Sequence, residues 1–350
     1  MYTRDARATI VCDIRRGAAA LVYSGAIACS PAATTTDASA SDGATSGAAT
    51  DPAATDPAAT SSAATSTDAS ATAGTDGAPT TAGPDLPPPR ACNGDPALCD
   101  RTFDRVAFPC THNAFSSTDA GFSAINANQN FGLARQLADG VRCMMLDVTD
   151  DGGDTALCHG PCALGSLDHR EQLQLIAAFL DANPDELLTI IYQDDVSVER
   201  IVADLEAVGL GARVYTHATG EPWPTLAAMI DADTRLFVTA ESGGPPPAWF
   251  HHVWDLVWDT PYSFKSADEF NCDLNRGSVD NDLFLVNHWV NTPIDTPSED
   301  GAKEVNAFDV LYGRATQCQR EAGQLPNFLA VDFYDHGDLF AAVRALNGLQ

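Results

Sequence analysis

The sequence predicts an α/β protein with a (β/α)8 barrel of the TIM type, in regular or distorted form, preceded by a signal peptide and a disordered linker. Between residues 92 and 350, apolar strand-like runs alternate with helix-like runs, a pattern typical of a parallel sheet covered by helices. This part has 259 residues, the usual size of eight β/α units. Polar residues also recur where the predicted strands end. An open, doubly wound sheet is the alternative architecture.

Residues 1–29 have the organisation of an export signal. Two adjacent arginines precede a short apolar run, GAAALVYSGAIA, which leads to Cys29. The run is too short to span a membrane, and such segments are removed on export. The residues before Cys29 are similar to a bacterial lipobox, although Ala26 stands where Leu is usual. Lipidation of Cys29 and ordinary cleavage nearby both fit the sequence.

Residues 30–91 predict a disordered linker. Ala, Thr, Ser, Asp, Gly and Pro dominate this segment, and no large apolar residue occurs before Leu86. A segment of this composition cannot bury enough apolar surface to offset the entropy lost on ordering. We interpret it as a tether behind an exported or anchored N-terminus, with a spacer of no specific role as the alternative.

The remaining part, 92–350, contains the elements of the predicted barrel. Apolar, β-rich runs predict strands at 105–112, 141–148, 156–160, 187–194, 235–241, 253–260, 283–289 and 327–334. Amphipathic spacing predicts helices at 129–140, 167–184, 196–208, around 302–322 and at 338–347. Gly140 and Pro184 provide stop signals for the first two helices.

The charge of the chain excludes several classes of partner. The chain has 19 basic and 48 acidic residues, and the part from residue 92 onwards has 14 basic and 39 acidic residues. A nucleic-acid-binding protein needs a basic surface, and electrostatic docking on an anionic membrane needs one too. We therefore expect neither.

The cysteines indicate an oxidising compartment. Eight of the ten cysteines follow residue 91, an even number in a chain with an export signal. Local bridges 92–99 and 158–162 are consistent with the short spacing, and 272–318 and 110–143 are further candidates. Eight cysteines allow about 105 pairings, so the sequence alone does not fix the connectivity.

Polar side chains follow the predicted strands at their carboxyl ends. His112 and Asn113 end the first strand, Asp147 the second, Asp194 the fourth and His288 the seventh, while His159 follows the third and Asp332 lies in the last. The carboxyl ends of parallel barrel strands share one face, where active sites lie. Alternation supports this placement, because Phe108, Cys110 and His112 share a strand face, as do Cys143, Met145 and Asp147.

Two histidines beside carboxylates suit acid–base chemistry. One imidazole takes a proton from an attacking hydroxyl, and the other gives a proton to the leaving group. The carboxylates orient the imidazoles or hold a cation. This combination suits the cleavage of a phosphodiester.

Several motifs carry a resemblance to a known family. They are FPCTHNAF (108–115), QLADGVRCMMLDV (136–148), ALCHGPCALG (156–165), DLFLVNHW (282–289) and NFLAVDFYDHGDL (327–339). With these motifs, most of 91–350 resembles the phosphatidylinositol-specific phospholipase C X-domain family, within the PLC-like phosphodiesterase superfamily. The resemblance implies a barrel enzyme that cleaves phosphodiesters.

The resemblance also implies roles for individual residues. His112 matches the general base that activates the attacking hydroxyl, and His159 matches the general acid that protonates the leaving alcohol. Asp332 resembles the last-strand Asp that supports the base. Arg142 lies in the GVR motif, where it either contributes positive charge in catalysis or forms a structural ion pair.

The resemblance implies a Ca²⁺ or Mg²⁺ site in part. Asn113 and Asp147 match a pair of cation ligands in calcium-dependent members, and we expect Asp194 as a third ligand, although the strand register leaves Gln193 as its alternative. Met145 stands where those members carry a Glu. Metal-independent bacterial members have an Arg at the position of Asp147, so this sequence follows neither pattern completely.

The expected protein is therefore an exported phosphodiesterase of the phospholipase C type. We expect a monomer that acts on a phospholipid or another phosphodiester, outside the cell or at its surface, as an outer-membrane lipoprotein or through peripheral membrane contact. Glycerophosphodiester or sphingomyelin hydrolysis is an alternative activity. A catalytically silent surface-binding module is an alternative of a different class.

Overall fold

The structure is a computed structural model that describes residues 89–349. The predicted signal peptide with Cys29, and the predicted linker up to residue 88, lie outside the described residues. Within residues 89–349, no helix combines the length and apolarity that crossing a bilayer requires.

A curled sheet of eight parallel strands forms the centre of the domain, in the order β7-β6-β5-β2-β1-β10-β9-β8. The strands are β1 (Phe108–Thr111), β2 (Cys143–Asp151), β5 (Leu188–Asp194), β6 (Leu236–Ala240), β7 (His251–His252), β8 (Val257–Asp259), β9 (Leu283–His288) and β10 (Phe328–Val331). Among the described residues, β7 and β8 do not pair with each other, so the barrel is open along one seam. The predicted TIM-type barrel is confirmed in distorted form.

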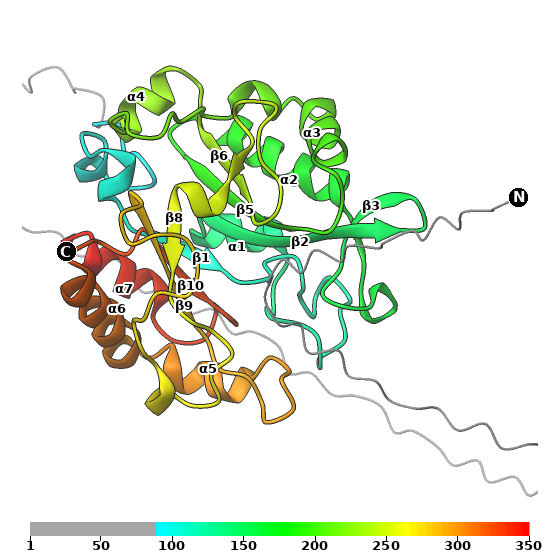
Figure 1. Ribbon diagram of the computed structural model, residues 1–350, viewed down its shortest axis with the longest axis vertical. Coiled ribbons are helices and arrows are strands. Elements are labelled where there is room, and N and C mark those ends of the chain that lie inside the picture. The colour runs from blue at the N-terminus through cyan, green and yellow to red at the C-terminus, as the bar shows by residue number, and fades with distance from the viewer. Residues whose placement is uncertain (1–88, 350) are drawn as a thin grey trace, which may run out of the picture. The chain divides into compact units, whose positions relative to one another are not determined.

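Helices cover the outside of this sheet, with α2 and α3 on one side of the view in Figure 1 and α6 and α7 on the other. They are α1 (Leu133–Asp139), α2 (His169–Ala182), α3 (Val198–Ala207), α4 (Leu226–Asp231), α5 (Glu299–Val305), α6 (Phe308–Ala322) and α7 (Leu339–Leu346). The sequence shows why α2 starts where it does, since the Asp168 carboxylate accepts the Glu171 backbone N–H as an N-cap.

The helix predictions missed one helix and joined two others. Helix α4 was not predicted, and the single helix expected around 302–322 is two helices, α5 and α6. The helix is interrupted at Asn306, between α5 and α6. The side-chain amide of Asn306 donates to the backbone carbonyls of Asp332 (2.8 Å) and Phe333 (3.3 Å). The break therefore supports the end of β10, where a predicted site residue lies.

The prediction of a third parallel strand at 156–160 was wrong. Strand β2 continues beyond the sheet, and β3 (Asp154–Leu157) returns antiparallel beside it, followed by the short β4 (Leu167–Asp168). Leu157 pairs with Val148, so the residues after β3 come back to the level of Asp147. His159 thus reaches the carboxyl end of the sheet by a hairpin return.

The predicted alternation of strand faces is confirmed. Phe108, Cys110, Cys143 and Met145 belong to the apolar cluster inside the curled sheet. Met144 and its neighbours of the same parity pack against the helices outside. The polar residue that follows the apolar ones on each inward face therefore lies at the carboxyl-terminal opening of the barrel, here called the mouth.

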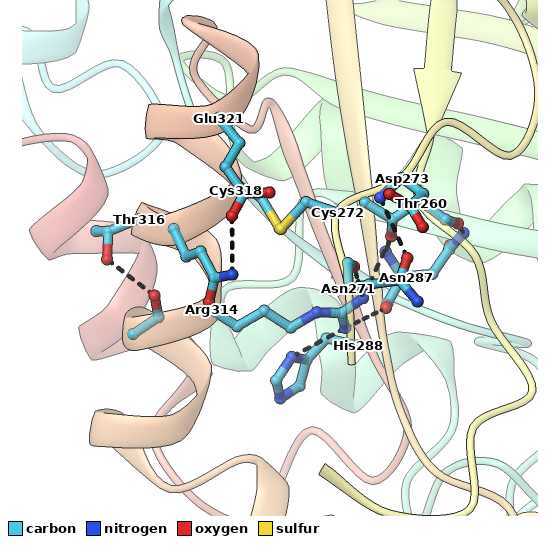
Figure 2. Close-up of a disulfide and its surroundings, with 12 residues drawn as sticks. Thr260, Asn271, Cys272, Asp273, Asn287, His288, Arg314, Thr316, Cys318 and Glu321 are labelled. Carbon is cyan, nitrogen blue, oxygen red and sulfur yellow. Dashed lines mark hydrogen bonds between the residues drawn. A yellow bond between two sulfur atoms is a disulfide. The ribbon is translucent and has the colours of Figure 1, made fainter. Parts of the chain in front are cut away.

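All four candidate disulfides are present: Cys92–Cys99, Cys110–Cys143, Cys158–Cys162 and Cys272–Cys318. Cys110 and Cys143 are register partners on β1 and β2, which brings them within bonding reach inside the barrel. Cys272–Cys318 joins a long loop to α6, as Figure 2 shows.

Candidate functional site

A polar pocket lies at the carboxyl ends of the parallel strands. Its lining includes His112, Asn113, Asp147, His159, Gln193, Glu241, Tyr262, Arg276 and Trp289. Asp332 lies directly behind this lining, in contact with His112. The structure therefore brings together five of the seven predicted site residues, and Arg142 and Asp194 lie elsewhere.

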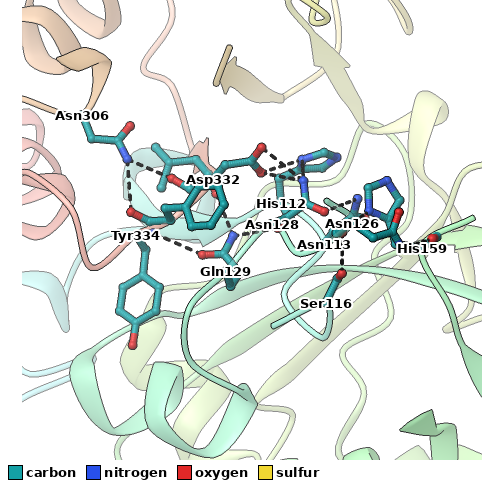
Figure 3. A network of polar contacts seen from close by, with 12 residues as sticks. His112, Asn113, Ser116, Asn126, Asn128, Gln129, His159, Asn306, Asp332 and Tyr334 are labelled. Carbon is teal, nitrogen blue, oxygen red and sulfur yellow. Dashed lines mark hydrogen bonds and ion pairs between the residues drawn. The ribbon is translucent and has the colours of Figure 1, made fainter. Parts of the chain in front are cut away.

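His112 is held by Asp332 in a defined orientation. His112 Nδ1 lies 2.8 Å from Oδ1 of Asp332, which directly follows β10, the strand beside β1. Asp332 is only 1% exposed, and both of its carboxylate oxygens accept bonds from the Asn128 amide (3.0 and 3.1 Å), as Figure 3 shows. An ionised carboxylate only accepts, so Nδ1 carries the proton and Nε2 remains available as a base.

The His112 ring is also fixed by stacking. The Trp289 ring, at the end of β9, lies parallel to it with centroids 3.9 Å apart and planes 7° apart. Stacking and the Asp332 bond together leave the imidazole little rotational freedom. Such preorganisation is what a general base needs.

His159 faces the same pocket from the β3 return. Its Nδ1 lies 2.7 Å from the backbone carbonyl oxygen of Asn126, which can only accept, so Nε2 is the nitrogen left for chemistry. Burial lowers the pKa of His159, and the bond to the carbonyl opposes that shift. In its protonated form, His159 can therefore give a proton from Nε2 to a group in the pocket.

Asn113 and Asp147 lie side by side in the pocket. One polar atom of the Asn113 amide is 2.9 and 3.2 Å from the two carboxylate oxygens of Asp147. If that atom is the nitrogen, it donates to Asp147, and if it is the oxygen, three oxygens converge. Burial raises the pKa of Asp147 to about 7, with His112 opposing the shift and Glu241 adding to it.

The raised pKa of Asp147 predicts a pH dependence of stability in metal-free protein. The folded state holds a proton that the unfolded state releases near pH 4, so stability falls as the pH rises towards 7. We expect the free energy of unfolding to fall by about 1–3 kcal/mol more between pH 5 and 8 in the wild type than in Asp147→Asn. Urea titrations in excess chelator measure the difference, and equal slopes would contradict the assignment.

The structure of β5 shows which of Gln193 and Asp194 faces the pocket. Gln193 faces the pocket, whereas the Asp194 carboxylate accepts the backbone N–H groups of Ser242 and Gly243, both at 2.8 Å. The prediction of Asp194 as a metal ligand was therefore wrong. Alternate residues of a strand point to opposite faces, and Asp194 is on the outward one.

Sequence reasoning missed Glu241, the acidic residue directly after β6. Its carboxylate accepts a bond from Arg276 Nη1 at 2.8 Å, and burial raises its pKa while Arg276 opposes the rise. Arg276 is anchored in turn by the fully buried Asp259, through Nε (3.1 Å) and Nη2 (2.6 Å). The strand-end rule that selected Asp147 would also have selected Glu241 and Asp259, which ends β8.

The loop that contains Tyr262 and Arg276 is held in place by Arg314 and by the Cys272–Cys318 disulfide. Arg314 on α6 is 6% exposed and donates to the backbone carbonyls of Asn287 (2.6 Å) and Asn271 (3.0 Å). Figure 2 shows this contact beside the Cys272–Cys318 disulfide. The two links fasten the loop to α6 and β9, so Arg276 reaches the pocket from a fixed frame.

The catalytic assignment of Arg142 was wrong. This residue directly precedes β2, at the amino end of the strands, away from the pocket. Its Nε donates to Glu186 Oε2 at 2.7 Å, and its Nη1 donates to the carbonyls of Leu137 and Val141. The alternative, a structural ion pair, is confirmed.

His288 is structural. It is fully buried, its Nε2 lies 2.9 Å from the Val305 carbonyl, and its Nδ1 faces Arg314. Burial, assisted by the nearby Arg314 charge, lowers the pKa of His288 to about 3, so it stays neutral. His169, at the start of α2, is also buried, between Asp204 and Tyr192.

The comparisons with known proteins identify a family. A family model described as PI-PLC X 1 matches residues 98–347. A PI-PLC X domain-containing protein 1 of Arthroderma benhamiae is 29% identical, covering 74% of this chain and 90% of its own length. A PI-PLC X domain-containing protein of Arabidopsis thaliana is 30% identical, over 77% of this chain and 66% of its own.

Two further similarities bear on localisation and fold. A protein of Arthroderma benhamiae named only as an uncharacterized secreted protein is 27% identical, with 74% of this chain and 64% of that protein covered. A solved structure of the phosphatidylinositol-specific phospholipase C of Staphylococcus aureus superposes with a TM-score of 0.51. It covers 72% of this chain and 95% of its own at 14% identity. At that identity the likeness shows the fold alone.

Proposed function

The chain belongs to the PI-PLC X family, and on that premise we propose that it cleaves phosphodiester bonds of phospholipids, by the phosphatidylinositol-specific phospholipase C type of reaction. The observation that carries the proposal is the placement of two histidines in one pocket, each with Nδ1 occupied and Nε2 available. Single polar residues at strand ends are common, but two such imidazoles facing one cavity suit proton transfer at both ends of a displacement.

His112 is the general base of the proposed reaction. Its Nε2 takes the proton from a headgroup hydroxyl, whose oxygen then attacks phosphorus. Asp332 keeps the proton of the imidazole on Nδ1 and stabilises the imidazolium that forms. Trp289 holds the ring plane during this transfer.

His159 is the general acid. Its Nε2, which carries a proton in the imidazolium form, gives that proton to the diacylglycerol oxygen as the bond from phosphorus to that oxygen breaks. The imidazole that remains keeps its proton on Nδ1. The first step therefore releases an alcohol and leaves a cyclic phosphate on the headgroup. Water opens this ring when the two histidines exchange roles.

The donor atoms in the pocket fit a hard cation. Asn113, Asp147, Gln193 and Glu241 present only oxygen or amide groups, which are the ligands that Ca²⁺ and Mg²⁺ prefer. Such an ion would bind beside the Asp147 carboxylate with the Asn113 amide oxygen turned towards it, in place of the amide N–H donation to Asp147. A bound divalent cation would supply positive charge opposite the phosphate, which these acidic side chains otherwise repel. Arg276 already offsets part of the negative charge of Glu241.

Chelation tests the cation. We expect excess EDTA to lower the rate on phosphatidylinositol by about tenfold or more, because an acidic pocket without a cation disfavours an anionic substrate. Added Ca²⁺ should restore the rate in the wild type and fail to do so in Asp147→Ala. Full activity in excess EDTA would contradict the proposed cation.

The substrate class is tested with a panel of phosphodiesters. The purified protein is incubated with phosphatidylinositol, glycerophosphoinositol, sphingomyelin and phosphatidylcholine, with and without Ca²⁺. Cleavage of phosphatidylinositol with release of diacylglycerol supports the proposal. Cleavage of sphingomyelin alone would favour the other substrate class, and the absence of any cleavage would favour a silent binding module.

We also propose export. The four disulfides among the described residues suit an oxidising compartment, and a secreted relative is similar over most of this chain. Anchoring through Cys29, peripheral membrane contact and a monomeric state remain predictions of the sequence.

A further inference from the structure

We propose that the Cys158–Cys162 disulfide and Asn126 form a clamp that positions His159 as the proton donor. This inference rests on the proposed function and adds positioning residues to it. The clamp sets the rate for substrates whose leaving group needs a proton, and it matters little for substrates whose leaving group does not.

The disulfide closes a very short loop around His159. Cys158 and Cys162 are four positions apart, and His159, Gly160 and Pro161 lie between them. Gly160 has a φ of +70°, in the left-handed region that glycine adopts without steric cost. Without a crosslink, a glycine at this point would allow the histidine to swing away from the pocket.

Both ends of the loop are anchored. On one side, the Cys158 N–H donates to the Asp147 carbonyl at 3.3 Å, and Cys158 is 3% exposed. On the other side, Cys162 begins a single helical turn, Cys162–Leu164, and the Leu164 carbonyl accepts the Ser123 N–H at 2.9 Å. The disulfide therefore connects β2 to the segment that contains Asn126.

Asn126 holds His159 at two points, which Figure 3 shows. Its backbone carbonyl oxygen accepts from His159 Nδ1, and its side-chain amide donates to the His159 backbone carbonyl. The same Asn126 carbonyl also accepts a bond from Ser116 Oγ at 2.9 Å, which fixes its direction. These contacts keep a proton on Nδ1 and aim Nε2 at the cavity shared with His112. Nε2 then carries the second proton, the one to be donated, in the imidazolium form.

The short spacing distinguishes this disulfide from a general staple. A crosslink restricts the unfolded chain more when it encloses a longer segment. Cys272–Cys318 spans 46 positions, whereas Cys158–Cys162 spans four. The main effect of the Cys158–Cys162 disulfide is therefore on the local geometry around His159.

The leaving group provides the test. Two substrates share the headgroup phosphodiester, one with diacylglycerol and the other with p-nitrophenol as the leaving group. The second leaves as a stable anion without protonation, so it needs no general acid. We expect Cys158→Ser/Cys162→Ser to lower kcat on the lipid by about tenfold or more, and on the aryl ester by less than about twofold. His159→Ala should show the same selectivity with a larger loss.

A matched control is available at the other end of the barrel. Cys92→Ser/Cys99→Ser also removes a short disulfide, which spans seven positions, and it should leave both rates unchanged. Asn126→Ala, which keeps all disulfides but loses one contact, should shift the two rates in the same selective way. Equal losses on both substrates, or no loss on either, would overturn the clamp.

A second measurement separates failure of the clamp from failure of the proposed function. Long-range ¹H–¹⁵N spectra of the histidine rings report the tautomer of His159 without any turnover. We expect a single Nδ1–H tautomer in the wild type and a mixture in Cys158→Ser/Cys162→Ser. An unchanged spectrum in the variant would overturn the clamp, whereas a wild type that keeps the single tautomer but cleaves no phosphodiester would overturn the proposed function alone.

Discussion

Substitution His112→Ala is expected to lower kcat/KM on phosphatidylinositol by about 10²–10⁴-fold, the usual contribution of a general base. The variant loses the one imidazole, among residues 89–349, that faces the pocket with a buried carboxylate behind it. The fold should persist, because the substitution removes a side chain at the mouth of the barrel and leaves the apolar side chains inside the barrel unchanged. Release of radiolabelled headgroup from vesicles measures the loss, and circular dichroism checks the fold.

His252→Ala is the matched control for this variant. His252 lies outside the pocket, partly exposed, with Nδ1 3.4 Å from the Asp255 carboxylate. Its substitution should change the rate by less than about twofold, in line with surface substitutions elsewhere. Similar losses in both variants would show that His112 acts through stability and would contradict its role as the base.

Substitution Asp332→Asn is expected to reduce the rate by up to about 10⁴-fold, the size of loss found when a carboxylate that orients a catalytic histidine is neutralised. The new amide keeps the shape of the side chain but offers a donor to His112 Nδ1. The proton of the imidazole then moves to Nε2, and the base is lost. Rate measurements between pH 5 and 9 should show the loss throughout that range.

Asp335→Asn serves as the control for Asp332→Asn. Asp335 is three residues further on, and its exposed carboxylate accepts from the half-buried amide of Asn130 (3.0 and 3.3 Å). We expect unchanged kinetics from this variant. An active Asp332→Asn enzyme would show that the buried carboxylate is a structural group and not part of the base.

Much of the fold follows from local pattern in the sequence. Alternation along 108–112 and 143–147 predicts which side chains enter the barrel, because strand periodicity depends only on the backbone. The hairpin of β2 and β3 could not be predicted in this way, since a short apolar run such as 156–160 has the same composition in a parallel and an antiparallel strand. The interruption between α5 and α6 at Asn306 could not be predicted from local pattern either. The role of Asn306 depends on a contact with the end of β10, which is distant in the chain.

Most of the predicted site residues were found because they are polar residues at strand ends, and the supporting residues in loops were missed. His112, Asn113, Asp147 and His159 stand out as polar residues after strands. Asn126 and Asn128 lie in a loop with no strand pattern, and only tertiary contact gives them a role. Asp194 was wrong by one position, because a strand end fixes a location but one residue reverses the face.

The acidity of the domain is partly explained by the structure. Asp147 and Glu241 line the pocket, and Asp259 and Asp332 lie buried behind it as anchors for Arg276 and His112. Charges placed in this way favour a cationic group at the mouth and disfavour a bare phosphate.

One measurement tests the central claim, that two histidines cleave a phosphodiester in this pocket. ³¹P NMR follows phosphatidylinositol vesicles with Ca²⁺ and either the wild type or His112→Ala. We predict that the wild type converts the lipid signal to that of a cyclic phosphodiester and then to a phosphomonoester, while His112→Ala leaves the lipid signal in place. An unchanged lipid signal with the wild type, or the same conversion with His112→Ala, would contradict the account.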